Sequence, residues 1–192
     1  MPKNKKTLWQ NTALLILLIT NGLILLAGAM MGPIYALFVE EIGGSLLEAS
    51  LTGAIFAFAA GITALISGRY ADKIKENELI IVLGYGMIGL GFLLYLFVDS
   101  IWFLFLVQII IGFGEAIYSP AFDALYTKHM DHGKVGLQWG VWETMNYFIY
   151  GIGAILGGLI VTLFNFQAIF LLMMLLCAGS AVYIYLLPRK LL

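Results

Sequence analysis

Long apolar runs alternate with short polar connections along the whole chain. Mostly apolar runs of about twenty residues or more occupy positions 11–38, 48–68, 79–98, 101–126, 136–163 and 166–187. About twenty helical residues cross a hydrocarbon core of about 30 Å, so this pattern predicts six membrane-spanning helices. The connections are too short to hold a soluble domain. We therefore expect a single all-α integral membrane domain over residues 1–192, whose first span is retained rather than cleaved as a signal sequence.

Composition agrees with a membrane protein that is not an enzyme. Hydrophobic residues make up 62% of the chain and charged residues 11%, where soluble domains carry about 25% charged residues. The only histidines, His129 and His132, lie in a polar connection away from any intramembrane serine, which argues against a membrane protease. Cys177 is the single cysteine, so no disulfide can form within the chain. We expect no cofactor, no metal site and no nucleic-acid partner.

The basic residues all fall on one side of the predicted membrane domain. The ten Lys and Arg residues lie before the first span, between spans two and three, between spans four and five, or after the last span. The opposite connections carry only acids, among them Glu40, Glu41 and Asp99. By the positive-inside rule both termini are cytoplasmic, and we expect a multi-pass protein of the cell membrane. An even number of spans also means that a second copy would enter the membrane in the same orientation.

Three predicted spans carry a polar stripe at helical spacing. Apart from Gln167 at the start of the sixth, spans three and six hold no charged or amide residue within their apolar runs. The simplest arrangement therefore puts spans one, four and five around a polar interior and spans three and six against lipid. The stripes consist of Asn21, Gly28, Gly32 and Tyr35 in span one, of Gln108, Gly112, Glu115, Ser119 and Phe122 in span four with Asp123 at its margin, and of Trp139, Glu143, Asn146, Tyr150 and Gly157 in span five.

Glu115 lies near the middle of its span. An ionised acid at that depth costs at least ~2.5 to 3.5 kcal/mol unless water, a cation or a proton relieves it. One alternative is a structural glutamate that is hydrogen-bonded in a helix contact. The functional interpretation is a cavity acid that exchanges a proton or binds a cationic substrate. Glu143 lies only about two turns into its span, and is either a site residue or an acid that reaches the headgroups.

The residue types in the predicted interior also restrict the substrate. No Lys or Arg falls within a span, so an anionic substrate would find no basic partner there. We expect a cationic or neutral amphipathic small molecule. Aromatic rings near the polar stripes either pack between helices or offer their faces to a cation. These are Tyr35, Tyr118, Trp142, Tyr147 and Tyr150.

Small residues form a second kind of stripe on spans two and five. Such stripes permit close helix packing, either within the chain or against another copy. They consist of Gly53, Ala57, Gly61, Ala64 and Gly68 in span two, and of Gly153 and Gly157, with Ala154 and Gly158 beside them, in span five.

Three segments resemble signatures of the major facilitator superfamily of transporters. Gly68-Arg-Tyr-Ala-Asp72-Lys73 is similar to that family's 2/3-loop signature Gly-x-Leu-Ala-Asp-Arg, with Lys73 in place of arginine. The segment 108–116 resembles the helix 4 signature Arg-x-x-Gln-Gly-x-Gly-x-Ala, with Gln108 at the place of the arginine. The segment 153–158 is similar to the antiporter signature Gly-Pro-x-x-Gly-Gly, with alanine in place of proline. In the family the 2/3 loop forms a cytoplasmic gate with an acid at the inner end of helix 4, which here implies Gly68, Asp72, Lys73 and Asp123.

The resemblance covers nearly the whole chain and implies half of a transporter. Members usually have two six-helix halves, each a 3+3 inverted repeat, with substrate bound between the halves. It implies alternating access and a titrating group at Glu115, as in a drug/proton antiporter. Two copies of this chain would replace the missing half, with span two of one against span five of the other. Two alternatives stay open: the chain is the N-terminal half of a longer transporter, or it is a non-transporting membrane scaffold.

Overall fold

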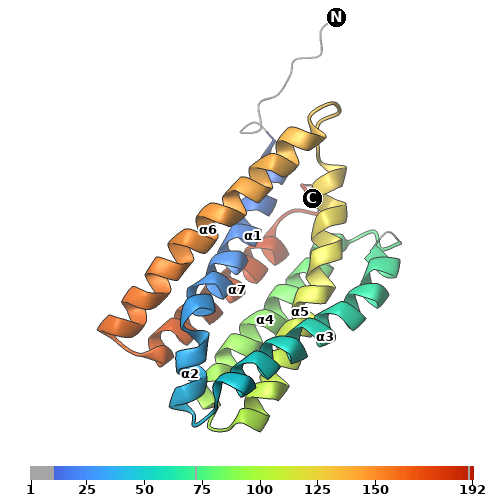
Figure 1. Cartoon of the computed structure of the whole chain (residues 1–192). Coiled ribbons are helices and arrows are strands. Elements are labelled where there is room, and N and C mark those ends of the chain that lie inside the picture. Colours follow the sequence, from blue (N-terminus) through green and yellow to red (C-terminus); the bar gives the residue numbers. More distant parts are fainter. Residues whose placement is uncertain (1–10, 72, 190) are drawn as a thin grey trace, which may run out of the picture.

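Every regular element within the residues that the computed structural model describes, 11–71, 73–189 and 191–192, is a helix (Figure 1). In these ranges six helical segments are long and apolar enough to cross a membrane, close to the positions predicted. The elements are α1 (Thr12–Met31), η2 (Gly32–Ile34), α2 (Tyr35–Glu41), α3 (Leu46–Ala71), α4 (Asn77–Leu94), η3 (Tyr95–Phe97), α5 (Ile101–Lys128), α6 (Val135–Leu163) and α7 (Phe166–Leu186).

The first span is interrupted at Pro33. Proline has no backbone N–H, and its ring clashes with the preceding turn of a helix. Accordingly α1 ends at Met31, the short 3₁₀ turn η2 carries Gly32 and Pro33, and α2 resumes at Tyr35. The interruption places Gly32 and Tyr35 on the wall of a cavity described below.

A second proline, Pro120, lies inside α5 without ending it. It cannot donate a hydrogen bond to the carbonyl four residues earlier, which belongs to Ala116. The hydroxyl of Ser67 on α3 donates a hydrogen bond to this carbonyl instead. Because Ala116 is buried, the bond pairs an acceptor that would otherwise lack a partner. Ser67 thereby ties α3 to α5.

The spans pack side by side in an open arc. The main contacts join α6 to α1, α1 to α7, α7 to α4, α4 to α5 and α5 to α3. The first three spans, α1, α3 and α4, correspond to the last three, α5, α6 and α7. Exchanging each span with its counterpart gives the same pairs of neighbours, with the order along the arc reversed. Three is an odd number of crossings, so the second triplet runs in the opposite direction. This is the packing expected of a 3+3 inverted repeat, and it leaves α3 and α6 at the two ends of the arc.

The two ends of the bundle differ in charge. The basic end carries the α3–α4 and α5–α6 connections and the end of α7, where Arg189 lies 3.9 Å from the buried Glu78 and Lys134 lies 3.6 Å from Asp131. The acidic end carries the α2–α3, η3–α5 and α6–α7 connections. That the basic end is cytoplasmic stays a prediction from the positive-inside rule.

Two of the glycines predicted to pack helices lie inside the chain's own α1–α6 contact. A Cβ added at Gly153 would lie 2.6 Å from the Cβ of Ala29, and one added at Gly157 would lie 1.9 Å from the carbonyl oxygen of Met30. These glycines allow α6 to approach the backbone of α1 closely. They are therefore not available to a second copy, which corrects the expected use of Gly157 in a contact between chains.

Other small residues face open space. A Cβ added at Gly53 or Gly61 of α3, or at Gly158 of α6, meets nothing within 4 Å, and Ala57 is exposed. Gly53 of α3 and Tyr150 of α6 border the cavity. Gly61 lies eight residues after Gly53, and Gly158 lies eight residues after Tyr150, which is a little more than two helical turns in each case. At 100° per residue these small residues lie on the edges of α3 and α6 that flank the open side of the arc.

Spans three and six, expected against lipid, have an exposed face and also contribute to the interior. One face of each is exposed, at Leu83 and Leu90 of α4 and at Leu175 of α7. The opposite faces pack against each other as the middle of the arc, and they contribute Phe92 and Met173 to the cavity. Apart from Asn77 and Glu78 at the start of α4 and Gln167 at the start of α7, these helices contain no charged, Asn or Gln residue.

Candidate functional site

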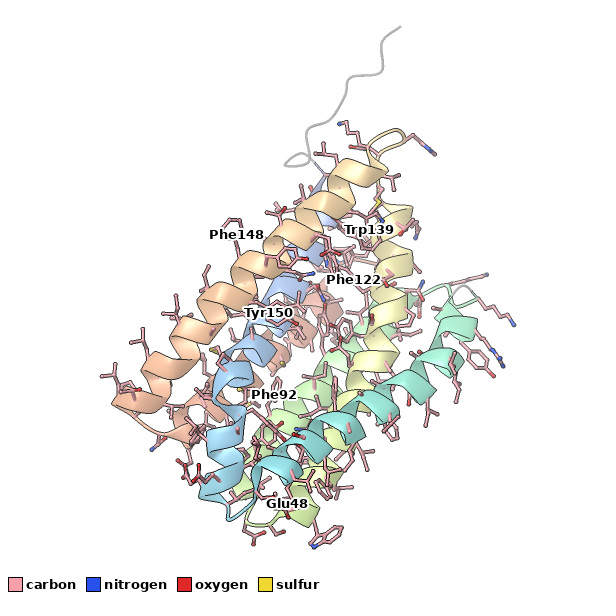
Figure 2. All side chains as sticks on the ribbon, in the orientation of Figure 1. Glu48, Phe92, Phe122, Trp139, Phe148 and Tyr150 are labelled. Carbon is pink, nitrogen blue, oxygen red and sulfur yellow. The ribbon has the colours of Figure 1, made fainter. Side chains whose placement is uncertain are left out.

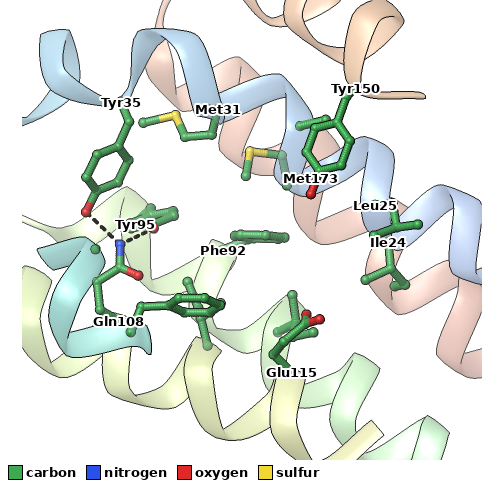
Figure 3. Close-up of a pocket in the computed structure, with 17 residues that line it drawn as sticks. Ile24, Leu25, Met31, Tyr35, Phe92, Tyr95, Gln108, Glu115, Tyr150 and Met173 are labelled. Carbon is green, nitrogen blue, oxygen red and sulfur yellow. Dashed lines mark hydrogen bonds between the residues drawn. The ribbon is translucent and has the colours of Figure 1, made fainter. Parts of the chain in front are cut away.

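A cavity of about 530 Å³ lies on the concave side of the arc. Sites for small molecules usually measure about 300–1,000 Å³. One wall comes from α1 and α2, the other from α5 and part of α3, and α4, η3 and α7 close the space between them (Figure 3). Its lining comprises Ile24, Leu25, Gly28, Ala29, Met31, Gly32, Tyr35, Gly53, Phe56, Ile88, Phe92, Tyr95, Gln108, Ile111, Glu115, Tyr150 and Met173.

Glu115 is the one charged side chain in this lining. It is residue fifteen of the 28 in α5, so it lies about 20 Å from either end of the helix at 1.5 Å per residue. The buried Tyr118, one turn further along, donates a hydrogen bond of 3.1 Å to Glu115 Oε1. Among the described lining residues the carboxyl group has no basic partner. An acid in this position favours a cation or a proton as its ligand.

Gln108 forms a second polar cluster, nearer the acidic end. Its amide Nε2 donates hydrogen bonds of 2.6 Å to the Tyr35 hydroxyl and 2.9 Å to the Tyr95 hydroxyl. Figure 3 shows the three side chains converging from α2, η3 and α5 at one end of the cavity. Gln108 precedes Glu115 by seven residues, which is nearly two turns, so both side chains lie on the same face of α5.

Asn21 lies behind the cavity wall rather than on it. The indole Nε1 of Trp142 donates to Asn21 Oδ1 at 3.1 Å, and Asn21 Nδ2 donates to the Tyr85 hydroxyl at 3.5 Å. The Tyr85 ring packs edge-on against Tyr118 with centroids 4.9 Å apart. This buried network joins α1, α4, α5 and α6 next to Glu115. Within it Asn21, Trp142 and Tyr118 hold these helices in place beside the carboxyl group.

An aromatic cluster fills the space between α5 and α6 toward the basic end. Phe122 and Tyr126 stack with centroids 5.5 Å apart, and Trp139 packs edge-on against both Tyr126 and Trp142. Figure 2 shows Phe122 and Trp139 on the facing sides of these two helices. Along α5 the cluster lies between Glu115 and the basic end, and the predicted cavity residue Trp142 belongs to this cluster rather than to the cavity lining.

The polar stripe predicted on span five divides between two faces. Tyr150 is 57% exposed and borders the cavity, whereas Glu143 of the stripe and the nearby Tyr147 are exposed and do not line it. Asn146 is buried, and its Oδ1 has no hydrogen-bond partner among the described residues. Ser119 on α5 is partly buried and does not line the cavity.

Residues 17–191 match the family model described as Major Facilitator Superfamily. The chain belongs to this superfamily. It is therefore an integral membrane protein of a transporter family, as the resemblance indicated.

Curated relatives in the superfamily are similar at low identity. The chain is 26% identical over 181 residues to "Multidrug resistance protein MdtG" of Dickeya zeae, covering 91% of this chain and 43% of the relative. It is 24% identical to an "Uncharacterized MFS-type transporter" of Methanocaldococcus jannaschii, covering 79% of this chain and 39% of the relative. The chain thus spans less than half the length of these two relatives. A third, "Uncharacterized MFS-type transporter YitZ" of Bacillus subtilis, is 24% identical over 145 residues, which are 87% of that protein.

The superfamily's 2/3-loop signature borders a second hollow, at the basic end. This hollow of about 590 Å³ lies between α3 and α5, and Gly68 and Asp123 both line it. Lys73 is exposed beyond the end of α3. The predicted gate residue Asp72 lies outside the described residues.

Several residues that line the cavity are apolar or aromatic, so the search for polar stripes did not predict them. Phe92, Tyr95 and Met173 belong to spans three and six, which contain only apolar and aromatic residues at these positions. Met31 and Phe56 likewise look like ordinary packing residues. Phe92, Tyr95 and Met173 were also missed because spans three and six were placed against lipid. The packing of α4 against α7 behind the cavity is a property of the tertiary structure.

Proposed function

We propose that this chain is a half-size secondary transporter that works as a homodimer and moves a cationic or neutral amphipathic small molecule by alternating access. One observation carries the proposal: a cavity of ligand size contains a single carboxyl group at half the depth of the bundle, and the end helices α3 and α6 border it through the exposed Gly53 and Tyr150. The open side needs a second wall. Another six-helix unit would supply it.

The lining supports an amphipathic cation as the substrate. Glu115 offers a negative charge without a basic partner in the cavity, and Phe92, Phe56 and Tyr150 add aromatic surface. Aromatic faces attract cations, most strongly where water is excluded. The name "Multidrug resistance protein" of one relative agrees with a substrate of this type.

Glu115 would couple the transport to protons. Its carboxylate holds the cation, and it takes up a proton when the cation leaves, because an ionised acid at this depth needs one or the other. The exchange of a cation for a proton at one group makes the transporter an antiporter. Transport out of the cell across the plasma membrane would then draw on the inward proton gradient.

The homodimer follows from the two open edges of the arc. A two-fold axis along the membrane normal would bring α3 of one copy against α6 of the other twice. The edges carry Gly53, Ala57 and Gly61 on α3, and Ala154 and Gly158 on α6, small residues that allow close packing. A relative of similar length also fits a half-size unit, because the 145 residues that match this chain make up 87% of that protein.

At the basic end the 2/3 loop would act as the cytoplasmic gate. Gly68 and Asp123 border the hollow there, and Asp72 and Lys73 would complete the gate when two copies close against each other.

Transport in proteoliposomes tests the proposal. Purified chain in vesicles with a pH gradient should move a fluorescent lipophilic cation such as ethidium against its concentration gradient. Glu115→Gln should abolish this movement, because the amide has no charge and exchanges no proton. Glu40→Gln, at an exposed acid of the acidic end, is the matched control and should transport normally. Equal transport by Glu115→Gln would refute the role of this residue.

Crosslinking tests the dimer separately. In a Cys177→Ser background, cysteines at Gly61 on one chain and at Gly158 on another should form a disulfide across the proposed α3–α6 contact. Cysteines at Gly61 and at Phe148, which points away from the bundle, should not (Figure 2). A monomer in lipid nanodiscs that forms no crosslink would exclude the homodimer.

The second candidate is the N-terminal half of a twelve-span transporter. The observation that favours it is the coverage of the multidrug relatives, of which this chain matches 43% or less. Six further apolar runs continuing in the same reading frame after Leu192 would decide for this candidate.

A further inference from the structure

The cavity contains two polar groups of different kinds on one helix face. Glu115 carries the charge, and Gln108 lies about 10 Å from it along the axis of α5, since seven residues separate them at 1.5 Å each. The surface between them is apolar: Ile111 of α5 lines the cavity between the two positions, and Figure 3 shows the Phe92 ring between the two polar side chains. A ligand that fills the cavity would meet a charge at one end and an uncharged polar cluster at the other.

The Gln108 cluster has hydrogen-bonding capacity left over. Both hydrogens of its Nε2 are used, one on Tyr35 and one on Tyr95. No hydrogen bond to Gln108 Oε1 exists within the described part of the chain, although Gln108 is buried and lines the cavity. An amide oxygen has two acceptor sites, and each tyrosine hydroxyl that accepts a hydrogen bond keeps its own hydrogen, for which a ligand would compete with the neighbouring side chains Thr52 and Tyr95 at Tyr35. The cluster therefore can accept one hydrogen bond and donate another.

We propose, building on the proposed function, that the cavity recognises amphipathic cations at two points, the charge at Glu115 and an uncharged group with both donor and acceptor atoms at Gln108, Tyr35 and Tyr95. A carboxamide is the simplest such group, because its N–H₂ would donate to Gln108 Oε1 while its oxygen accepts from a tyrosine hydroxyl. The two groups of the substrate are joined by an apolar segment that lies against Ile111 and Phe92. The cluster thus selects among lipophilic cations that Glu115 alone would not distinguish.

Two matched probes test the second recognition point. One is an alkyltriphenylphosphonium whose chain ends in a methyl group, and the other has the same chain ending in a carboxamide. Equilibrium dissociation constants of the radiolabelled probes are measured on the full chain in nanodiscs, with empty nanodiscs correcting for partition into lipid. The comparison uses the ratio of the two affinities, so a general loss of folded protein cancels.

The expected results differ between the two ends of the cavity. Gln108→Met should lower the ratio of carboxamide-probe to methyl-probe affinity roughly tenfold, the size expected for two hydrogen bonds. Tyr35→Phe, which keeps the ring and removes one hydroxyl, should weaken the carboxamide probe roughly threefold. Tyr183→Phe, an exposed tyrosine of α7, is the control and should change neither affinity. Glu115→Gln should weaken both probes by the same factor.

The outcomes separate this inference from the function on which it rests. If Gln108→Met and Tyr35→Phe change both probes equally, or change neither, the second recognition point is wrong, while a common loss in Glu115→Gln would still support the cation site. If Glu115→Gln binds both probes as tightly as the unmodified chain, the cation site itself is wrong.

Discussion

The hydroxyl of Ser67 on α3 donates a hydrogen bond to the carbonyl of Ala116, the one carbonyl in α5 that Pro120 deprives of its helical donor. The proline and the serine thus act as a pair across two helices. This contact holds α3, the least buried span, against the helix that carries Glu115. Its loss would loosen one wall of the cavity.

Ser67→Ala should therefore lower stability by about 1–3 kcal/mol, because it leaves a buried carbonyl unpaired. In a Pro120→Ala background the backbone N–H of residue 120 can satisfy the Ala116 carbonyl, and the same serine substitution should cost little. Thermal unfolding can be followed through the reaction of the buried Cys177 with a thiol-reactive dye. Ser50→Ala removes a hydrogen bond within an exposed turn of α3 and serves as the control. Equal costs in both backgrounds would contradict the pairing.

The neighbouring glycines of α6 should respond oppositely to the same substitution. Gly157→Ala puts a methyl group 1.9 Å from the Met30 carbonyl oxygen, so α1 and α6 must separate, at a cost of about 1–3 kcal/mol or more. Gly158→Ala meets open space and should leave the melting temperature of the monomer unchanged or raised. Melting curves in detergent compare the two variants directly. A tolerated Gly157→Ala would show that the α1–α6 contact is looser than described.

Trp142→Phe should destabilise the buried network beside Glu115. It removes the indole donor from Asn21 Oδ1 and leaves that acceptor without its partner, a loss of about 1–3 kcal/mol. Trp102→Phe, at an indole that is 79% exposed, is the matched control and should be nearly neutral. Chemical unfolding in mixed micelles measures both. If both variants unfold at the same denaturant concentration as the unmodified chain, the Trp142–Asn21 hydrogen bond does not contribute to stability.

Cation binding should depend on pH through Glu115. A protonated carboxyl group is neutral and offers a cation no charge, so affinity should fall as the pH is lowered through the titration of this group. Glu115→Gln should bind more weakly at every pH and lose this dependence. Titrations of a lipophilic cation across the pH range provide the measurement. A pH dependence that persists in Glu115→Gln would assign the titration to another group.

The apolar pattern was sufficient to predict the spans, because crossing a hydrocarbon core requires about twenty apolar residues whatever the tertiary fold. Helical periodicity also placed Gln108 and Glu115 on one face, and both line the cavity. Periodicity also placed Asn21 in a polar stripe, but its side chain lies behind the cavity wall, where it accepts a hydrogen bond from Trp142. A polar residue in a membrane helix needs a partner, and periodicity does not say whether that partner is a protein group or a ligand.

From its residues alone, this chain is determined to be a six-span membrane domain with a carboxyl group at mid-depth, since length, hydropathy and spacing are properties of each helix by itself. Only the tertiary structure decided which small-residue stripe packs inside the chain and which faces outward. It also brought Tyr35 and Tyr95, sixty positions apart, onto the amide of Gln108. The physical reason is that helices in a membrane associate through shape and hydrogen bonds rather than through burial from water. Their arrangement therefore depends on pairs of faces that no single helix reveals.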